Sequence, residues 1–476
     1  MRHSTFVTLC AGVLLLSSCK VGPHYHTPSA PIPPSFKESA EWKQAEPQDS
    51  RLRGDWWQPF GDPDLNMLEE QIDVSNQNIA AAEARFRAAR AAIRITGADL
   101  APTLTVGGSS TTSRISPNRA TGRPSFSAVT GTFYQLPIDL SYEADAWGRV
   151  RRTIEGNVDT AQATAADLET MRLSMHAEAA VDYFQLRGLD EEEQTLQASI
   201  VAFEKGLELT TNRYRQGVVS QMDVAQAQTQ LDTARAQATD LVVTRSQLEH
   251  AIAVLTGQSP AELTIGAGKL PTQPPPIPVG LPSGLLERRP DIAGAERRVA
   301  AANAQIGVAK AAFFPRFTFS FTGGLESSRL GNLLDWPSRF WSLGPSVAEI
   351  AFDAGRRRGM TQQAEANYDA MVAAYRQQVL TAFQEVEDNV AALRILSEEA
   401  AQQELAVTSS QRSVDIALNR YRGGIATYLD VITAQNVLLT NQRTAVTILT
   451  RRMTASVLLI KALGGGWDVS QLKNAG

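Results

Sequence analysis

The sequence has little cysteine, few aromatic residues and no excess of basic charge. Two cysteines occur in 476 residues, which excludes a fold stapled by several disulfides. Aromatic residues make up only 7% of the chain although hydrophobic residues make up 43%, a balance that favours extended helices over a bulky aromatic core. The net charge of −5 excludes the basic surface of a nucleic-acid-binding protein, so no nucleic acid is expected as a partner.

Residues suited to catalysis or metal binding are also scarce. Of the five histidines, His3 lies at the N-terminus, His24 and His26 lie in a proline-rich stretch, and His176 and His250 each stand alone on a predicted helix. The His24-x-His26 pair on a flexible segment is an incomplete metal site, and a solvated linker is the better interpretation. No phosphate-binding glycine loop or nucleophile elbow is present. We therefore expect no enzyme activity, metal or cofactor.

The first 18 residues are predicted to be an export signal. Arg2 and His3 form a short polar region, and an apolar stretch over 6–16 follows that is too short to span a bilayer. The tetrad Leu16-Ser17-Ser18-Cys19 resembles the lipobox of bacterial lipoproteins, in which cleavage precedes the cysteine and the cysteine is acylated. We expect a covalent lipid on Cys19; the alternative is an ordinary small apolar residue. Lys20 resembles the pattern that sends a lipoprotein to the outer membrane.

The chain contains a tandem duplication. The stretch Asn212–Gly217 returns as Asn419–Gly424, an offset of 207, and 10 of the 20 positions compared up to Leu231 and Leu438 are identical. A repeat of about 200 residues is far longer than the units of solenoid proteins. Each half should therefore be a complete structural arm, and the second arm should repeat what the first one does.

Proline content and helical periodicity divide the chain into segments. After the signal we predict an extended proline-rich segment (19–63), a first repeat (64–257), a proline-rich linker at mid-height (258–283), a second repeat (284–464) and a C-terminal tail (465–476).

Each repeat is predicted to contain one very long helix. Helical patterns run over about 150–214 and 356–421, each followed by a turn and a second helix that ends at Leu255 or Leu463. A further helix over about 64–100 is ended by Pro102, which cannot donate the helical hydrogen bond. At 1.5 Å per residue a 65-residue helix is about 98 Å long, so two of the shorter helices stacked end to end would match it.

Between the helices the hydrophobic period changes to two, which predicts a β-hairpin in each repeat (103–146 and 316–352). A half-buried sheet of a soluble protein would show the same alternation. Two features favour membrane strands: their lengths approach the 9 to 11 residues that cross a bilayer, and aromatic side chains that would suit its interfaces flank them. The latter are Tyr134, Tyr142, Phe317, Trp336 and Trp341.

Arginines follow both hairpins, at positions 149, 151 and 152 and again at 356, 357 and 358. They are interpreted as solvated helix starts or as contacts to lipid head groups on the inner side of the membrane, and both interpretations can hold together. Four strands cannot close a membrane barrel, because spanning barrels need at least about eight and an open edge in lipid leaves backbone groups without partners. Several copies must therefore share one barrel; two copies would give eight strands and three would give twelve.

The chain resembles the outer-membrane factor (TolC-like) family of tripartite efflux and type I secretion systems, most closely its lipoprotein branch related to OprM and NodT. The resemblance covers the mature chain and rests on Cys19–Pro23, Asp55–Phe60, Arg288–Asp291, Ala301–Pro315 and the two turn motifs. It implies an α+β, mainly helical homotrimer in which the duplicated arms form a long α-helical barrel continuous with a twelve-stranded transmembrane antiparallel β-barrel. It also implies a periplasmic adaptor and an inner-membrane pump, expected to be of the proton-driven RND type.

Each turn is followed by a hydroxyl residue and, three positions on, an acid, which is the pattern of a capping box: Ser220 with Asp223, and Thr427 with Asp430. In the resembled family the matching acids line a constricted, cation-attracting periplasmic entrance, and Tyr421 matches a tyrosine in the hydrogen-bond network that holds it shut. We therefore predict a periplasmic gate at Asp223, Asp430 and Tyr421.

The gate is expected to differ in detail from that of some relatives. Where those have a second acid and an arginine, this chain has Thr433 and Ala426. The bare tips either pack the turns or, as the resemblance implies, contact the adaptor; they are Gly217, Val218, Val219, Gly424, Ile425 and Ala426. Two interpretations are equally open for arginines 213, 215, 420 and 422: they take part in the adaptor contact at the tips, or they are ordinary charges at helix C-termini.

These observations predict a lipid-anchored channel in the bacterial outer membrane, with its helical tunnel in the periplasm. It would passively conduct small molecules, such as drugs or other toxic compounds, that its partners select and energise. Two alternatives remain: an exit duct for type I protein secretion, and a non-porous coiled-coil lipoprotein that acts as an envelope scaffold. The scaffold would leave the hairpins unexplained.

Overall fold

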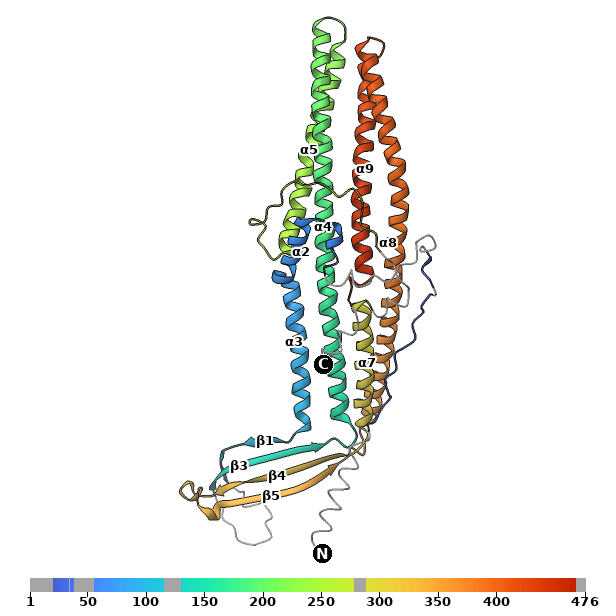
Figure 1. The fold of residues 1–476 in the computed structure, drawn as a ribbon. Coiled ribbons are helices and arrows are strands. Elements are labelled where there is room, and N and C mark those ends of the chain that lie inside the picture. Colours follow the sequence, from blue (N-terminus) through green and yellow to red (C-terminus); the bar gives the residue numbers. More distant parts are fainter. Residues whose placement is uncertain (1–19, 34, 38–54, 115–129, 278–287, 468–476) are drawn as a thin grey trace.

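The computed structural model describes residues 20–33, 35–37, 55–114, 130–277 and 288–467. Long helices form a slender shaft, and a β-sheet lies across its base (Figure 1). The two turns of the repeated motif lie together at the far end of the shaft. The signal segment, Cys19 and all of the C-terminal tail after Trp467 lie outside the described residues.

The two longest helices are α4 (Arg149–Arg215) and α8 (Arg356–Arg422), each of 67 residues. At 1.5 Å per residue each is about 100 Å long. Each turns back into a 35-residue helix, α5 (Gln221–Leu255) or α9 (Tyr428–Ala462). The bounds of α8 and α9 are those of α4 and α5 shifted by the repeat offset of 207, so the predicted duplication holds to the residue. No described helix is both long and apolar enough to cross a membrane.

The expected single helix over 64–100 is wrong. The chain forms α2 (Pro63–Ser75) and α3 (Gln77–Gly97), separated at Asn76. The buried Asn76 side chain accepts hydrogen bonds from the backbone of Asn78 and Ile79 at 2.9 and 3.0 Å, and it donates to the Leu255 carbonyl at 2.7 Å. Asparagine thus caps the new helix and joins it to the end of α5.

The second repeat has a matching junction. Helix α7 (Pro290–Ala311) begins below the end of α9, and Arg289 donates a hydrogen bond to the Ala462 carbonyl at 3.1 Å. The end-to-end stacking expected from helix lengths is therefore confirmed in both repeats, with α5 above α3 and α9 above α7 (Figure 1). Short 3-10 turns at Gln58–Phe60, Ala98–Leu100, Leu330–Asn332 and Trp336–Ser338 complete the described helices.

Five strand segments form one antiparallel sheet: β1 (Thr103–Val106), β2 (Ser109–Arg114), β3 (Thr130–Ala144), β4 (Arg316–Ser327) and β5 (Arg339–Ala348). Segments β1 and β2 both pair with β3, on either side of a break at residues 107–108, so they share the place of one strand. The two hairpins are joined because β3 also pairs with β4. The interrupted β1–β2 strand and β5 are left at the two edges.

The helices are partnered unequally. Helix α4 packs against α3, α5, α7 and α9, whereas α8 packs closely only against α7 and α9. Twenty-two residues of α4 are buried, against eleven of α8, although the two helices have the same length. One chain therefore leaves a face of α8 without a helix partner.

The N-terminal residues 20–37, where described, run as an extended strap along α7 and α8 (Figure 1). Arg152 holds the strap: it is buried and donates to the carbonyls of Val21 and Pro23 at 3.2 and 2.9 Å. It is therefore neither a solvated helix start nor a lipid contact, which corrects the expectation for this arginine. Arg151 and Arg357 instead form ion pairs with the acids Asp145 and Asp353 ahead of their helices.

Candidate functional site

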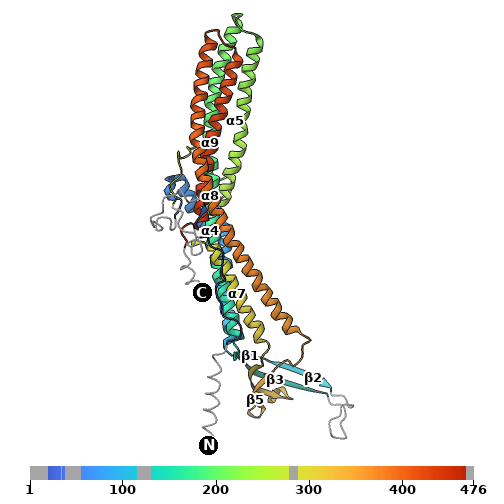
Figure 2. The same cartoon turned by 90° about the vertical axis from the view of Figure 1, so that its right-hand side faces the viewer.

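The far end of the shaft consists of two turns (Figure 2), and their φ angles and hydrogen bonds match. Gly217 has φ 69° and Gly424 has φ 76°, the left-handed conformation in which glycine avoids steric strain. The amide of Val218 bonds to the Arg213 carbonyl, and the amide of Ile425 bonds to the Arg420 carbonyl, each at 2.9 Å. This six-residue closure is the Schellman motif, so sequence identity in the repeat is reproduced as identical helix ends.

Both predicted acids are capping residues. The backbone N–H of Ser220 donates to Asp223 Oδ2 at 2.9 Å, and that of Thr427 donates to Asp430 Oδ2 at 2.9 Å. The side-chain hydroxyls of the two residues donate to the same oxygens at 2.8 and 2.9 Å. The hydrogen bonds from Thr427 lower the pKa of Asp430, which keeps this exposed carboxyl ionised at neutral pH. Asp430 therefore caps the start of α9 and also carries a negative charge at the tip.

Tyr421 is buried in a hydrophobic cluster between the two repeats. It is 2% exposed, its ring centroid is 5.3 Å from that of Tyr428, and its hydroxyl donates to Thr210 Oγ1 at 3.4 Å. Arg213 lies over the Tyr421 ring at 4.6 Å and also donates to the Tyr421 carbonyl. Burial raises the pKa of Tyr428 to about 12, so this phenol stays neutral. The contact of Arg213 was not predicted from the sequence, because a position near a helix end indicates no particular partner.

The predicted adaptor-contacting residues occupy the two turns. Val218 and Ile425 are 57% and 73% exposed, while Val219 is half-buried against the cluster around Tyr421 and Tyr428. Of the two departures from the resembled family, Ala426 is half-buried in its turn, and the Thr433 hydroxyl donates to the Leu429 carbonyl at 2.9 Å within α9. Each turn therefore exposes one apolar side chain directly after its glycine.

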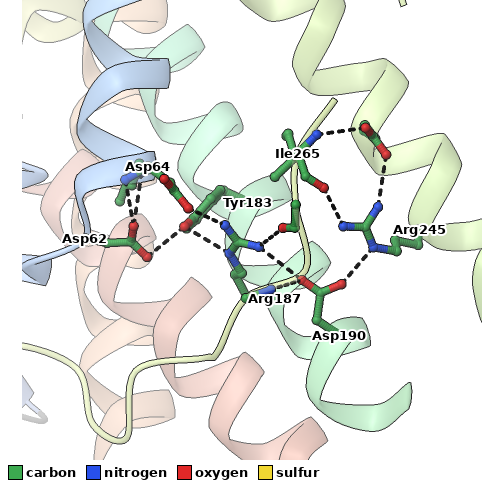
Figure 3. A network of polar contacts seen from close by, with 11 residues as sticks. Asp62, Asp64, Tyr183, Arg187, Asp190, Arg245 and Ile265 are labelled. Atoms are coloured by element: carbon green, nitrogen blue, oxygen red, sulfur yellow. Dashed lines mark hydrogen bonds and ion pairs between the residues drawn. The ribbon is translucent and has the colours of Figure 1, made fainter. Parts of the chain in front are cut away.

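A second polar site fixes the linker at mid-height (Figure 3). Arg187 of α4 is 2% exposed and donates to Asp64 at 2.8 Å, to the Gly266 carbonyl at 2.6 Å and to Asp190 at 3.1 Å. Arg245 of α5 donates to the other Asp190 oxygen and to the Ile265 carbonyl, each at 2.7 Å. Two arginines and one buried aspartate thus attach the described linker to the middle of the shaft.

His176 is not alone, contrary to the expectation from the sequence. Its Nδ1 is 2.6 Å from Glu69 and its Nε2 is 3.2 Å from Asp73, both on α2, and Trp57 stacks on its ring at 4.7 Å. The spacing of Glu69 and Asp73, four residues apart on one helix face, is the signal that could have predicted this contact. Burial lowers the pKa of His176, but the hydrogen bonds that the protonated ring donates to Asp73 and Glu69 outweigh this effect and raise the pKa to about 9.

This cluster predicts a pH dependence of stability. A histidine that binds its proton more tightly in the folded state stabilises the fold fully below the unfolded pKa of about 6.5, and that contribution is lost as pH rises through about 9. We expect the free energy of unfolding to fall by on the order of 2 kcal/mol between pH 7 and pH 10. Urea denaturation across this range measures it. A His176→Gln variant with the same pH slope as the parent would show that other groups cause it.

The described residues contain no group of three histidine, cysteine or acidic side chains placed to hold a metal ion. The fold defines a structural class: a long helical shaft, duplicated in sequence, that ends in a β-sheet with two unpaired edge strands.

The chain belongs to the outer membrane efflux protein family, whose model matches residues 68–258 and 281–465. The two matches coincide with the two repeats. The chain is 32% identical to the outer membrane protein OprJ of Pseudomonas aeruginosa over 472 residues, 98% of this chain and 97% of that one. It is 30% identical to the probable efflux pump outer membrane protein TtgC of Pseudomonas putida over 466 residues, 97% and 96% of the two chains.

Solved structures agree with this assignment. The outer-membrane channel OprN superposes with a TM-score of 0.88 at 32% identity, covering 94% of this chain and 100% of that one. The outer membrane protein VceC of Vibrio cholerae gives 0.81 at 30% identity, covering 87% and 99%. The predicted family, the mainly helical fold with its β-sheet region, the efflux-channel function and the outer-membrane location are thereby confirmed.

Proposed function

We propose that three copies of this chain form the outer-membrane channel of a tripartite efflux system, which takes up small molecules from a periplasmic adaptor and an inner-membrane pump. One observation carries the proposal: a single chain forms only part of a helical barrel and part of a β-barrel. Helix α8 lacks neighbours that its repeat counterpart α4 possesses, and the sheet ends in two open edges.

The repeat indicates how a second copy completes the wall. Within one chain, α4 of the first repeat packs against α7 and α9 of the second. Applying the same relation once more places α8 against the counterparts of α7 and α9, which are α3 and α5 of the next copy. The exposed apolar side chains of α8 on this view gain partners; they include Met360, Leu380, Ile395, Leu405 and Ile416. Arms from the two repeats then alternate around a closed ring.

Neighbouring copies would also complete the sheet. With β1 and β2 counted as one strand, each chain contributes four strands, and β5 of one copy would pair with the β1–β2 edge of the next. Twelve strands from three copies give a closed barrel without unpaired backbone groups in lipid. The choice of three copies over two rests on the family.

Cys19 is proposed as the lipid anchor. The described chain starts one residue later, where Lys20 pairs with Glu155 at 3.1 Å and the Val21 amide bonds to the Trp147 carbonyl at 3.1 Å. Both contacts lie where the sheet meets the helices, which is the membrane side of the shaft. A lipid on Cys19 would therefore enter the same membrane as the strands and would add an anchor that is independent of the fold.

The exposed tips are proposed to contact the adaptor, and the pump is expected to be of the proton-driven RND type. Related proteins are named for toluene, antibiotic and pyoverdine export. Because proteins of one fold serve such different compounds, we propose that the pump and adaptor choose the substrate and that this channel conducts passively.

Conductance in planar bilayers tests the function. The purified, lipidated protein is expected to give discrete single-channel currents. An envelope scaffold would pass no current, and that result would contradict the proposal. A type I secretion duct would also conduct, so a second measurement is needed: deletion of the gene should raise sensitivity to small toxic compounds and leave protein secretion unchanged.

Replacement of Asp430 tests the proposed gate. In a trimer, Asp223 and Asp430 would place six carboxylates around the axis at the tip. We expect Asp430→Ala to keep the helical circular dichroism, since Thr427 still caps the helix, but to raise conductance and weaken block by divalent cations. Asp223→Ala should do the same, because the two acids are repeat counterparts. Unchanged block in both variants would leave the acids with the capping role alone.

A further inference from the structure

The contact between Arg213 and Tyr421 joins the two repeats at the tip. Arg213 lies near the end of helix α4 of the first repeat, and Tyr421 lies near the end of α8 of the second. The guanidinium carbon is 4.6 Å from the tyrosine ring centroid, and Arg213 also donates to the Tyr421 carbonyl. An arginine over an aromatic face is a stabilising arrangement, and here it covers a phenol that is only 2% exposed.

Both residues of this contact have identical counterparts in the other repeat, at the offset of 207. Adding 207 to Arg213 gives Arg420, and subtracting 207 from Tyr421 gives Tyr214. In the single chain, however, Tyr214 is 44% exposed and Arg420 is exposed as well. The counterparts of the two side chains that stack between the repeats are therefore both exposed in the single chain.

Other contacts between the repeats are not preserved in this way. Gln230 donates to Asn436, but the counterparts of this pair are Val437 and Thr229. Arg443 pairs with Glu192, and its counterpart is Ala236. Retention of both the arginine and the tyrosine is therefore a specific feature of this position, beyond the general similarity of the halves.

We infer that Arg420 of one copy stacks on Tyr214 of the next copy, repeating between chains the stack that Arg213 and Tyr421 form within a chain. The inference rests on the proposed trimer and adds a defined contact to its tip. Six arginine–tyrosine stacks would then alternate around the ring, three inside chains and three between them. The tip would be fastened at each junction between neighbouring arms.

The two kinds of stack should differ in one respect. Inside the chain, Tyr421 donates to Thr210, whereas the counterpart of Thr210 is Ala417, which has no hydroxyl. The stack between chains would therefore depend on the aromatic ring of Tyr214 and not on a hydrogen bond from its phenol to that position. Tyr214→Phe should keep the contact, and Tyr214→Ala should remove it.

Cross-linking tests the inference directly. The only cysteines of the chain are Cys10 and Cys19, which we expect to be removed with the signal and blocked by lipid. In the full-length lipoprotein, Tyr214→Cys with Arg420→Cys, treated with a short bifunctional thiol reagent, should give covalent dimers and trimers on a denaturing gel. Either single variant should stay at the mass of one chain, and co-expression of the two single variants should give dimers. The matched control, Arg213→Cys with Tyr421→Cys, should link within a chain and stay at that mass.

The outcomes separate the inference from the proposed function. If the protein is trimeric and the control pair reacts, but the Tyr214 and Arg420 pair gives no product between chains, the inference is wrong and the trimer stands. If the protein is monomeric, both are wrong. Single-channel conductance provides a second readout. Tyr214→Ala should raise the conductance severalfold above that of the parent, whereas Tyr214→Phe should leave it at the parent value. Adding Arg420→Ala to Tyr214→Ala should change the conductance little further. Additive effects of the two alanines would contradict a direct contact.

Discussion

Gly324→Ala is expected to abolish assembly of the channel. Gly324 lies in β4 opposite Pro137 of β3, and a Cβ atom added there would be 2.1 Å from the Leu136 carbonyl oxygen. A backbone atom cannot move aside as a side chain can, so the strands must separate. They carry the only pairing between the two hairpins among the described residues, and each unpaired backbone group in lipid costs several kcal/mol. We expect a drop of at least about tenfold in oligomer recovered from outer membranes, measured by size-exclusion chromatography.

Gly344→Ala is the matched control. Gly344 lies in β5 of the same sheet, and a Cβ atom there meets nothing within 4 Å. The control should assemble like the parent, because an alanine methyl at this position meets no other atom of its own chain. If Gly324→Ala and Gly344→Ala are recovered as oligomer in equal amounts, strands β3 and β4 do not pair in the membrane in the register given above.

Arg187→Met is expected to cause the largest loss of stability in the shaft. Methionine fills much of the volume but leaves Asp190, which is wholly buried, with Arg245 as its only cationic partner (Figure 3). It also removes the hydrogen bonds to Asp64, Tyr183 and the Gly266 carbonyl. Breaking a buried ion pair on one side typically costs about 3–5 kcal/mol. Urea denaturation followed by circular dichroism at the helical band measures the change.

An exposed ion pair provides the comparison. Arg235 pairs with Glu204 at 2.7 Å, and their side chains are 53% and 45% exposed. Arg235→Met should lower the free energy of unfolding by less than about 1 kcal/mol. If the two methionine variants lose similar stability, the linker is held mainly by other contacts than the Arg187 network.

The repeat made the helices predictable. Because the offset of 207 is constant, the bounds of one arm predict those of the other, and the turn motif with its glycines marks both tips. The sheet strands followed from their period of two. These features are encoded locally, in periodicity, capping residues and turns, and local patterns are what a single sequence shows best.

Contacts between distant segments were not predictable in the same way. Nothing near Asn76 indicates that its side chain joins the end of α5, and the buried Arg152 looked like its solvated neighbours. The role of Arg213 depends on Tyr421, more than 200 residues away. Pairing of β3 with β4 likewise follows from how the two arms pack. In each case the partner is chosen by tertiary structure, which sequence periodicity does not record.

The mass of the intact assembly tests most directly whether one chain is part of a shared wall. Native mass spectrometry of the detergent-purified lipoprotein is expected to give one species of three chains, each with its lipid. A protein that remains a single chain under conditions that preserve its helices would contradict the account, because a sheet with two open edges and an unpaired face on α8 has no place alone in a membrane.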